Sequence, residues 1–220
     1  MLCSVPGFPF SETVVAELRD YPEWHKGRGR YAIWMLPIDC PQVLDYMAEV
    51  RAQLADLLHP TRRQPHITVF VCGFEQPRGV HDDDFTAAQL QQQVAALEAL
   101  RYSACTLQVD RPDSFSSAAY LSITDQGGHL DAWRTALAAS GTEIRFGPYV
   151  PHLTLGLYRR AIDAETLRER LDKIAAPQAL PLPVDRLEYV TYGSADMFGP
   201  LTCRQIVRFG PGKQAVLSNQ

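Results

Sequence analysis

Hydrophobic residues along the chain follow two different periods, which predicts a mixture of helices and strands. Apolar residues three or four apart predict helices at 41–58, 85–100, 130–139 and 163–175. Short runs rich in β-branched and aromatic residues predict strands at 30–36, 65–73, 104–110, 118–124, 150–158, 187–192 and 203–209. Both kinds of element alternate over nearly the whole chain.

The order of these elements describes two similar halves. Residues from about 30 to 110 read β-α-β-α-β, and residues from about 111 to 220 read β-α-β-α-β-β, without a linker-like composition between them. We therefore expect one α+β domain (30–220) built from duplicated βαβ-type halves. Residues 1–29 are rich in proline, glycine and charge and are expected to be an N-terminal extension.

The acidic run 82–84 precedes a predicted helix, where such carboxylates usually form a solvated cap.

Charge and cysteine content indicate the cellular compartment and the kinds of partner to expect. The net charge is −4 and the pI about 5.8, whereas coating long duplex nucleic acid needs a broad basic face. The five cysteines are scattered and form no CxxC pair, which favours a reducing compartment. No apolar run approaches the roughly 20 residues of a membrane span, and the N-terminus lacks signal-peptide features. We expect a cytoplasmic monomer without membrane or long nucleic-acid partners.

Two segments share one pattern. Residues 65–69 read Pro-His-Ile-Thr-Val and residues 151–155 read Pro-His-Leu-Thr-Leu, each on a predicted strand that follows a helix. Side chains alternate along a strand, so the histidine and threonine of a motif face one side and the apolar residues face the core. Two such strands across a cleft would place two imidazoles and two hydroxyls around one point.

These four groups suit the cleavage of a phosphoester. An ordinary histidine titrates near pH 6.5, so one of His66 and His152 can take a proton from an attacking water or hydroxyl while the other gives a proton to the leaving oxygen. The hydroxyls of Thr68 and Thr154 can donate to the non-bridging oxygens as negative charge builds there. No cofactor is required for this chemistry.

The paired His-apolar-Thr strands resemble the 2H phosphoesterase superfamily, the 2′-5′ RNA ligase and cyclic phosphodiesterase group. The resemblance covers about residues 30–209 and implies that the two histidines and two threonines are catalytic. It also implies two antiparallel sheets that face a central cleft, with helices outside. Members cleave 2′,3′-cyclic phosphates on RNA ends or related esters, and some perform reversible 2′-5′ ligation. The expected substrate is therefore a small nucleotide or an RNA terminus. Residues 1–29 and the turn at 112–117 depart from the pattern.

Further residues near the motifs are candidates for substrate binding. Tyr158 and Phe70 share the face of the motif residues if their strands stay regular, although an edge-strand or core position is the alternative. Tyr149 and Tyr192 could stack on a base at the mouth of the cleft or could be packing residues. Arg63 could supply the local positive potential that an anionic substrate needs, or it could be a solvated surface residue.

Two other functions stay open. A metal hydrolase could use His66 and His152 as ligands, but the chain has no HExxH or similar close pair, and the threonines would be unexplained. A non-catalytic module could bind nucleotides or RNA ends on the same fold, although a degenerate binder is not expected to keep both motifs. The remaining histidines, including His59, lack the motif and are expected on the surface.

Overall fold

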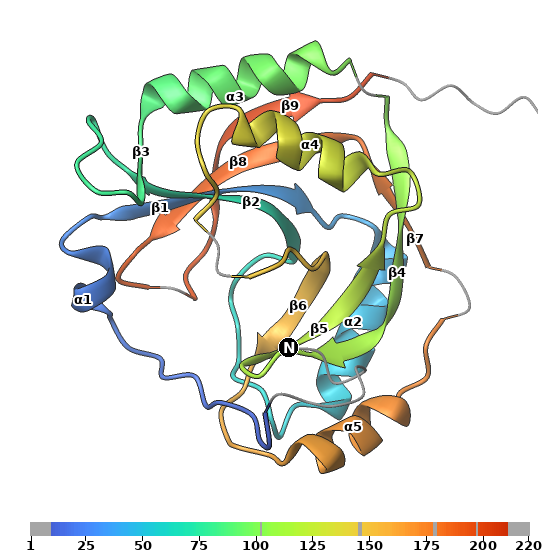
Figure 1. Ribbon diagram of the computed structural model, residues 1–220. Coiled ribbons are helices and arrows are strands. Elements are labelled where there is room, and N and C mark those ends of the chain that lie inside the picture. Colours follow the sequence, from blue (N-terminus) through green and yellow to red (C-terminus); the bar gives the residue numbers. More distant parts are fainter. Residues whose placement is uncertain (1–9, 102, 145–146, 178–179, 197, 211–220) are drawn as a thin grey trace, which may run out of the picture.

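Antiparallel strands dominate the structure and form one curled sheet with helices around it (Figure 1). The computed structural model describes residues 10–101, 103–144, 147–177, 180–196 and 198–210. The strands are β1 (Arg30–Pro37), β2 (His66–Glu75), β3 (Asp84–Phe85), β4 (Cys105–Ser114), β5 (Ala118–Thr124), β6 (His152–Leu157), β7 (Leu180–Val184), β8 (Arg186–Gly193) and β9 (Thr202–Arg208). The helices are α1 (Pro22–His25), α2 (Pro41–Gln53), α3 (Ala87–Ala99), α4 (His129–Ala138) and α5 (Ala164–Asp172). The predicted α+β class is confirmed.

The sheet consists of two lobes that are interleaved in sequence. Within the described residues its order is β7-β4-β5-β6-β2-β1-β8-β9, and β3 adds to β2 in parallel. The strands β4 to β7 form one lobe, whereas β8 and β9 return to pair beside β1 in the other. The expected division near residue 110 therefore does not separate the lobes.

The prediction missed β7, and its prolines explain why. Pro181 and Pro183 alternate with buried apolar residues in this segment. A proline cannot donate a backbone hydrogen bond, so it is confined to edge strands. The strand β7 is such an edge, since among the described strands it pairs only with β4.

A single residue pair joins the two lobes between β2 and β6. Ile67 pairs with Leu153, and no further pair between these strands follows among the described residues. Both side chains are fully buried in the main core, as the alternation of the motifs predicts. The core lies where α2 packs on β6 and β7, and where α4 packs on β2. No helix of the described residues is long and apolar enough to cross a membrane.

Side chains from the second lobe occupy the edge of β2 beyond this pair. The Tyr149 hydroxyl donates to the Thr68 carbonyl at 3.0 Å, and Arg134 donates to the next carbonyl along β2 at 2.7 Å. The Val71 amide donates to the Glu143 carboxylate at 3.0 Å. These bonds satisfy backbone groups that a longer ladder with β6 would use, so the pairing between the two strands does not continue here.

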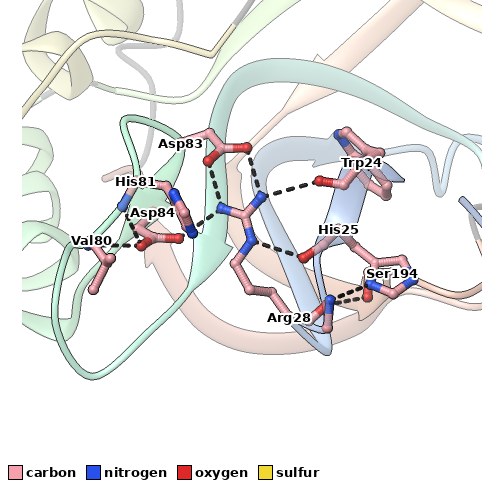
Figure 2. Close-up of polar contacts among 9 residues, drawn as sticks. Trp24, His25, Arg28, Val80, His81, Asp83, Asp84 and Ser194 are labelled. Atoms are coloured by element: carbon pink, nitrogen blue, oxygen red, sulfur yellow. Dashed lines mark hydrogen bonds and ion pairs between the residues drawn. The ribbon is translucent and has the colours of Figure 1, made fainter. Parts of the chain in front are cut away.

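A buried arginine anchors the segment before β1 (Figure 2). The Arg28 guanidinium donates to the Asp83 carboxylate at 2.5 and 3.0 Å and to the Asp84 carboxylate at 2.8 Å. The side chains of Arg28 and Asp84 are only 6% and 1% exposed. The expectation of a solvated helix cap is therefore wrong for these two carboxylates, because they neutralise a buried cation. The Ser194 hydroxyl, just after β8, donates to the Arg28 carbonyl.

Residues 13–16 of the predicted N-terminal extension lie beside the end of β6. The Thr13 amide donates to the Ile162 carbonyl at 2.9 Å, and the Ala16 amide donates to the Tyr158 carbonyl at 2.8 Å. The His59 ring is hydrogen-bonded to the Ala16 carbonyl at 2.9 Å. Residues 1–9 of the predicted extension lie outside the described residues, as do residues 211–220 of the predicted domain.

Candidate active site

The two motifs meet at the junction between the lobes. Because β2 and β6 are antiparallel and Ile67 pairs with Leu153, the residue before one member of the pair lies across from the residue after the other. His66 is therefore across from Thr154, and Thr68 is across from His152. All four side chains are half-buried, whereas the two apolar residues between them are buried. The register thus brings each imidazole toward the hydroxyl of the other motif.

Both imidazoles are held in the same way. The Nδ1 atom of His66 is 2.8 Å from the Gln64 carbonyl, and the Nδ1 atom of His152 is 2.7 Å from the Val150 carbonyl. A carbonyl only accepts, so Nδ1 carries the hydrogen in both rings. The Nε2 atom of each ring is therefore the position that gains or loses a proton.

The surroundings of the two rings differ. Burial lowers the pKa of His66 to about 4, and the charges of Arg63 and of a protonated His152 act in the same direction. The His152 ring instead meets aromatic rings edge-on, with its centroid 4.9 Å from that of Phe115 and 5.4 Å from that of Tyr120. The chain thus keeps His66 neutral in the free protein over the physiological pH range.

A cavity of about 250 Å³ opens beside His66. Its lining includes His66, Thr68 and Thr154, whereas His152 lies outside it. The cavity continues under the segment between α2 and β2, where His59 and Arg63 reach it. A group attached to a phosphate at the histidines therefore has room on the His66 side.

The loop between β8 and β9 forms one wall of this cavity. The Gln64 side chain makes two hydrogen bonds with the backbone of Leu201. It donates to the carbonyl at 3.1 Å and accepts from the amide at 2.8 Å. The same Gln64 orients His66 through its backbone carbonyl. Arg63 donates to the Gly199 carbonyl at 3.2 Å, and its guanidinium lies 4.0 Å above the Tyr192 ring. The position of His66 is thus coupled to that of the loop.

Two sequence-predicted substrate residues lie in the core. Phe70 is 2% exposed, and Tyr158 is fully buried with its hydroxyl 2.6 Å from the Ser114 hydroxyl. A β-bulge follows the threonine of each motif, because Val69 and Leu155 have no partner in the pairing with β1 and with β5. Each bulge reverses the alternation of the following side chains, so the prediction that Phe70 and Tyr158 face the substrate is wrong.

The other three predicted substrate residues lie near the motifs. Tyr192 and Arg63 line the cavity, so the structure brings both to His66. Tyr149 does not line it, since its hydroxyl is bonded to the Thr68 carbonyl and the Arg134 guanidinium lies 3.8 Å from the centroid of its ring. Tyr149 therefore positions the strand that carries Thr68.

Sequence reasoning missed several residues of the site. His59 was expected on the surface but lines the cavity, as do Gln64 and Phe198. Phe115, in the turn that departs from the family pattern, packs on His152. The position of Gln64, two residues before His66, was the one available signal, because a carbonyl there can hold the ring. Among the described residues, no group of three or more His, Cys, Asp or Glu side chains is arranged to hold a metal ion.

Comparisons with known proteins agree with this architecture. The sequence model of the 2′-5′ RNA ligase superfamily matches residues 37–196. The structure of E. coli LigT complexed with 3′-AMP is similar over 82% of this chain and 98% of LigT, with a TM-score of 0.57 and 18% sequence identity. A structure described as a phosphoesterase aligns with 83% of this chain and 99% of its own length, with a TM-score of 0.55 and 14% identity. At such identities the likeness shows the fold. None of the curated proteins compared with the chain matches it significantly.

Proposed function

Since the chain belongs to the 2′-5′ RNA ligase superfamily and shares the LigT-like phosphoesterase fold, we propose that it is a phosphoesterase in which His66 and His152 act on one phosphodiester without a metal. The preferred bond is a 2′,3′-cyclic phosphate or a related nucleotide ester. Hydrolysis is the main reaction, and ligation through a 2′-5′ bond is the same chemistry with a nucleotide hydroxyl in place of water.

The observation that carries this proposal is the register between β2 and β6. The pair of Ile67 with Leu153 sets each imidazole across from the threonine of the other motif. Cβ atoms of directly opposite residues in antiparallel strands are roughly 5 Å apart, which leaves room for one phosphate group to contact all four side chains. Both rings also carry the Nδ1 hydrogen on the side away from this phosphate.

The proposed step is an in-line displacement at phosphorus. Neutral His66 takes a proton from the attacking water through Nε2 as the new P–O bond forms. Protonated His152 gives its proton to the ribose oxygen as the old P–O bond breaks, so the charge on the pair is conserved. The hydroxyls of Thr68 and Thr154 donate to the non-bridging oxygens. The low pKa of His66 supports its role as the base.

The charge distribution of the protein supports a small substrate over a long nucleic acid. Three arginines at or near the surface are already paired with carboxylates, since Arg160 and Arg170 both pair with Asp56 and Arg186 pairs with Asp39. A net charge of −4 argues against binding a long duplex, which needs a broad basic face. E. coli LigT, whose fold is shared, has been solved with 3′-AMP. We therefore place a mononucleotide, or the last nucleotide of an RNA, at the cavity with Arg63 and Tyr192.

A turnover screen tests the proposal. Wild-type protein is incubated with 2′,3′-cyclic nucleotides, ADP-ribose cyclic phosphate and 2′-5′ dinucleotides, and products are separated by chromatography. We expect hydrolysis of at least one cyclic phosphate, a loss of several orders of magnitude in His66→Ala and in His152→Ala, and little further loss in the double variant. Ligand-induced stabilisation of the wild type without turnover of any substrate would instead favour a nucleotide-binding module.

A further inference from the structure

Arg63 is a cation with an incomplete set of partners at the wall of the cavity. Its Nε atom donates to a neutral carbonyl, that of Gly199, at 3.2 Å. Its Nη2 atom is buried and has no hydrogen-bond partner among the described residues. The two structural arginines Arg28 and Arg134, by contrast, each have a carboxylate within 2.8 Å. An unpaired guanidinium donor that is shielded from water is costly unless a ligand completes it.

The surroundings of Arg63 favour an anion over a neutral acceptor. The Tyr192 ring lies 4.0 Å from the guanidinium carbon and covers one face of the cation, so a ligand would bind in the guanidinium plane at Nη2, the donor without a partner among the described residues. Burial lowers the pKa of Arg63, and Tyr192 and the charge of Asp196, which is paired with Arg62, offset this only in part. A further negative charge beside Arg63 would therefore stabilise its charged form. The Thr61 hydroxyl, which accepts from the Arg63 amide at 3.1 Å, lines the same cavity and has a hydrogen to donate. The edge of a neutral base could accept the hydrogen bond from Nη2 but would not balance the positive charge of the guanidinium.

We place the proposed catalytic phosphate at the edge of this cavity, which His66, Thr68 and Thr154 line together with Arg63. It lies between His66 and His152, and His152 is outside the cavity that Arg63 lines. The cavity volume of about 250 Å³ is enough for a nucleoside-sized group between the two positions. Resting on the proposed function, we infer that Arg63 and Thr61 hold a second phosphate of the substrate. The preferred substrates are therefore nucleotides that carry a phosphate besides the one that is cleaved.

Calorimetric binding of product-like ligands tests this inference without requiring turnover. The ligands are adenosine 3′-phosphate and adenosine 3′,5′-bisphosphate, together with the corresponding 2′ isomers. We expect the additional 5′-phosphate to tighten binding to the wild type at least about 10-fold in one isomer pair, because charge-assisted bonds to a shielded guanidinium are strong. Arg63→Gln should abolish this gain. The matched control is Arg62→Gln, since Arg62 is 80% exposed and pairs with Asp196, and it should retain the gain.

Two results would overturn the inference. One is equal affinity of the wild type for mono- and bisphosphates in both isomer pairs, which can be measured even if Arg63→Gln does not fold. The other is a gain that persists in a folded Arg63→Gln protein. Failure of the proposed function is a separate result, in which 2′,3′-cyclic adenosine phosphate is not hydrolysed with or without a 5′-phosphate. In that case the binding comparison still decides whether Arg63 recognises a second phosphate.

Discussion

The acid limb of the pH–rate profile should lie far below the ordinary pKa of histidine. His66 is the proposed base, and its pKa in the free protein is about 4 instead of 6.5. At pH 5 a group with a pKa of 4 is about 90% neutral, whereas an ordinary histidine is about 3% neutral. The value of kcat/KM, which reports the free enzyme, should therefore keep about nine-tenths of its plateau at pH 5, roughly 30-fold more than an unperturbed base allows.

The cause of this shift can be tested separately. Besides burial, the positive charge of Arg63 disfavours protonation of His66. Arg63→Gln should therefore raise the pKa of His66 and move the acid limb to higher pH, while Arg62→Gln should leave it in place. The alkaline limb reports proton loss from the group that acts as acid, and both limbs belong to the interacting pair.

The low pKa of His66 also affects stability. Between about pH 6.5 and 4 the unfolded chain takes up a proton at His66, whereas the folded protein does not. This group therefore makes the free energy of unfolding fall as the pH drops through that window.

Steady-state kinetics from pH 3.5 to 9 with a 2′,3′-cyclic nucleotide measure the two limbs. An NMR titration of the imidazole protons, assigned with His66→Ala and His152→Ala, measures the pKa of His66 directly. An acid limb near pH 6.5, together with a His66 resonance that titrates there, would refute the reasoning. A His66 resonance that titrates near pH 4 without a matching acid limb would show that His66 is not the base.

Three further predictions concern the residues around the reacting groups. Thr68→Ala and Thr154→Ala should each lower kcat on the order of 10²-fold in single-turnover assays, because each removes one donor to the phosphate, and unchanged rates would remove the hydroxyls from the mechanism. Gln64→Ala should lower kcat/KM about 10-fold with little change in melting temperature, since its two bonds couple the loop to the base, and wild-type kinetics would contradict that coupling. Arg28→Met leaves Asp84 buried without its cation and should cost about 3–5 kcal/mol in urea unfolding, whereas a loss under about 1 kcal/mol would show that the ion pair is not needed.

The sequence predicts the burial pattern within each motif better than it predicts the residues around the motifs. Alternation along a strand correctly predicts that Ile67 and Leu153 are buried, while the histidine and threonine on either side of each face the other way. The rule holds here because each motif is only a few residues long. The same rule fails for Phe70 and Tyr158, since one unpaired residue after each threonine reverses the alternation. Such a bulge depends on the neighbouring strand, which the local pattern does not contain.

Long-range pairing also limits what the sequence can predict about the fold. The return of β8 and β9 to the first lobe comes from pairing between residues that are more than a hundred positions apart. The place of Phe198 in the cavity wall and the bond from Arg63 to the Gly199 carbonyl follow from that return, so neither residue could be assigned to the site in advance. Arg63 and Tyr192 were identified as candidates because one is near a motif and the other ends a predicted strand. Their stacking on one another became visible only in the structure.

The central claim is that two histidines, and no metal, cleave one phosphodiester. The most direct measurement is the rate at which wild-type protein hydrolyses a 2′,3′-cyclic nucleotide before and after exhaustive treatment with EDTA. The account predicts the same rate in both samples, and no activity above background in His66→Ala or His152→Ala. Loss of activity on EDTA treatment that returns on addition of zinc or manganese would contradict it, and would make the two histidines metal ligands.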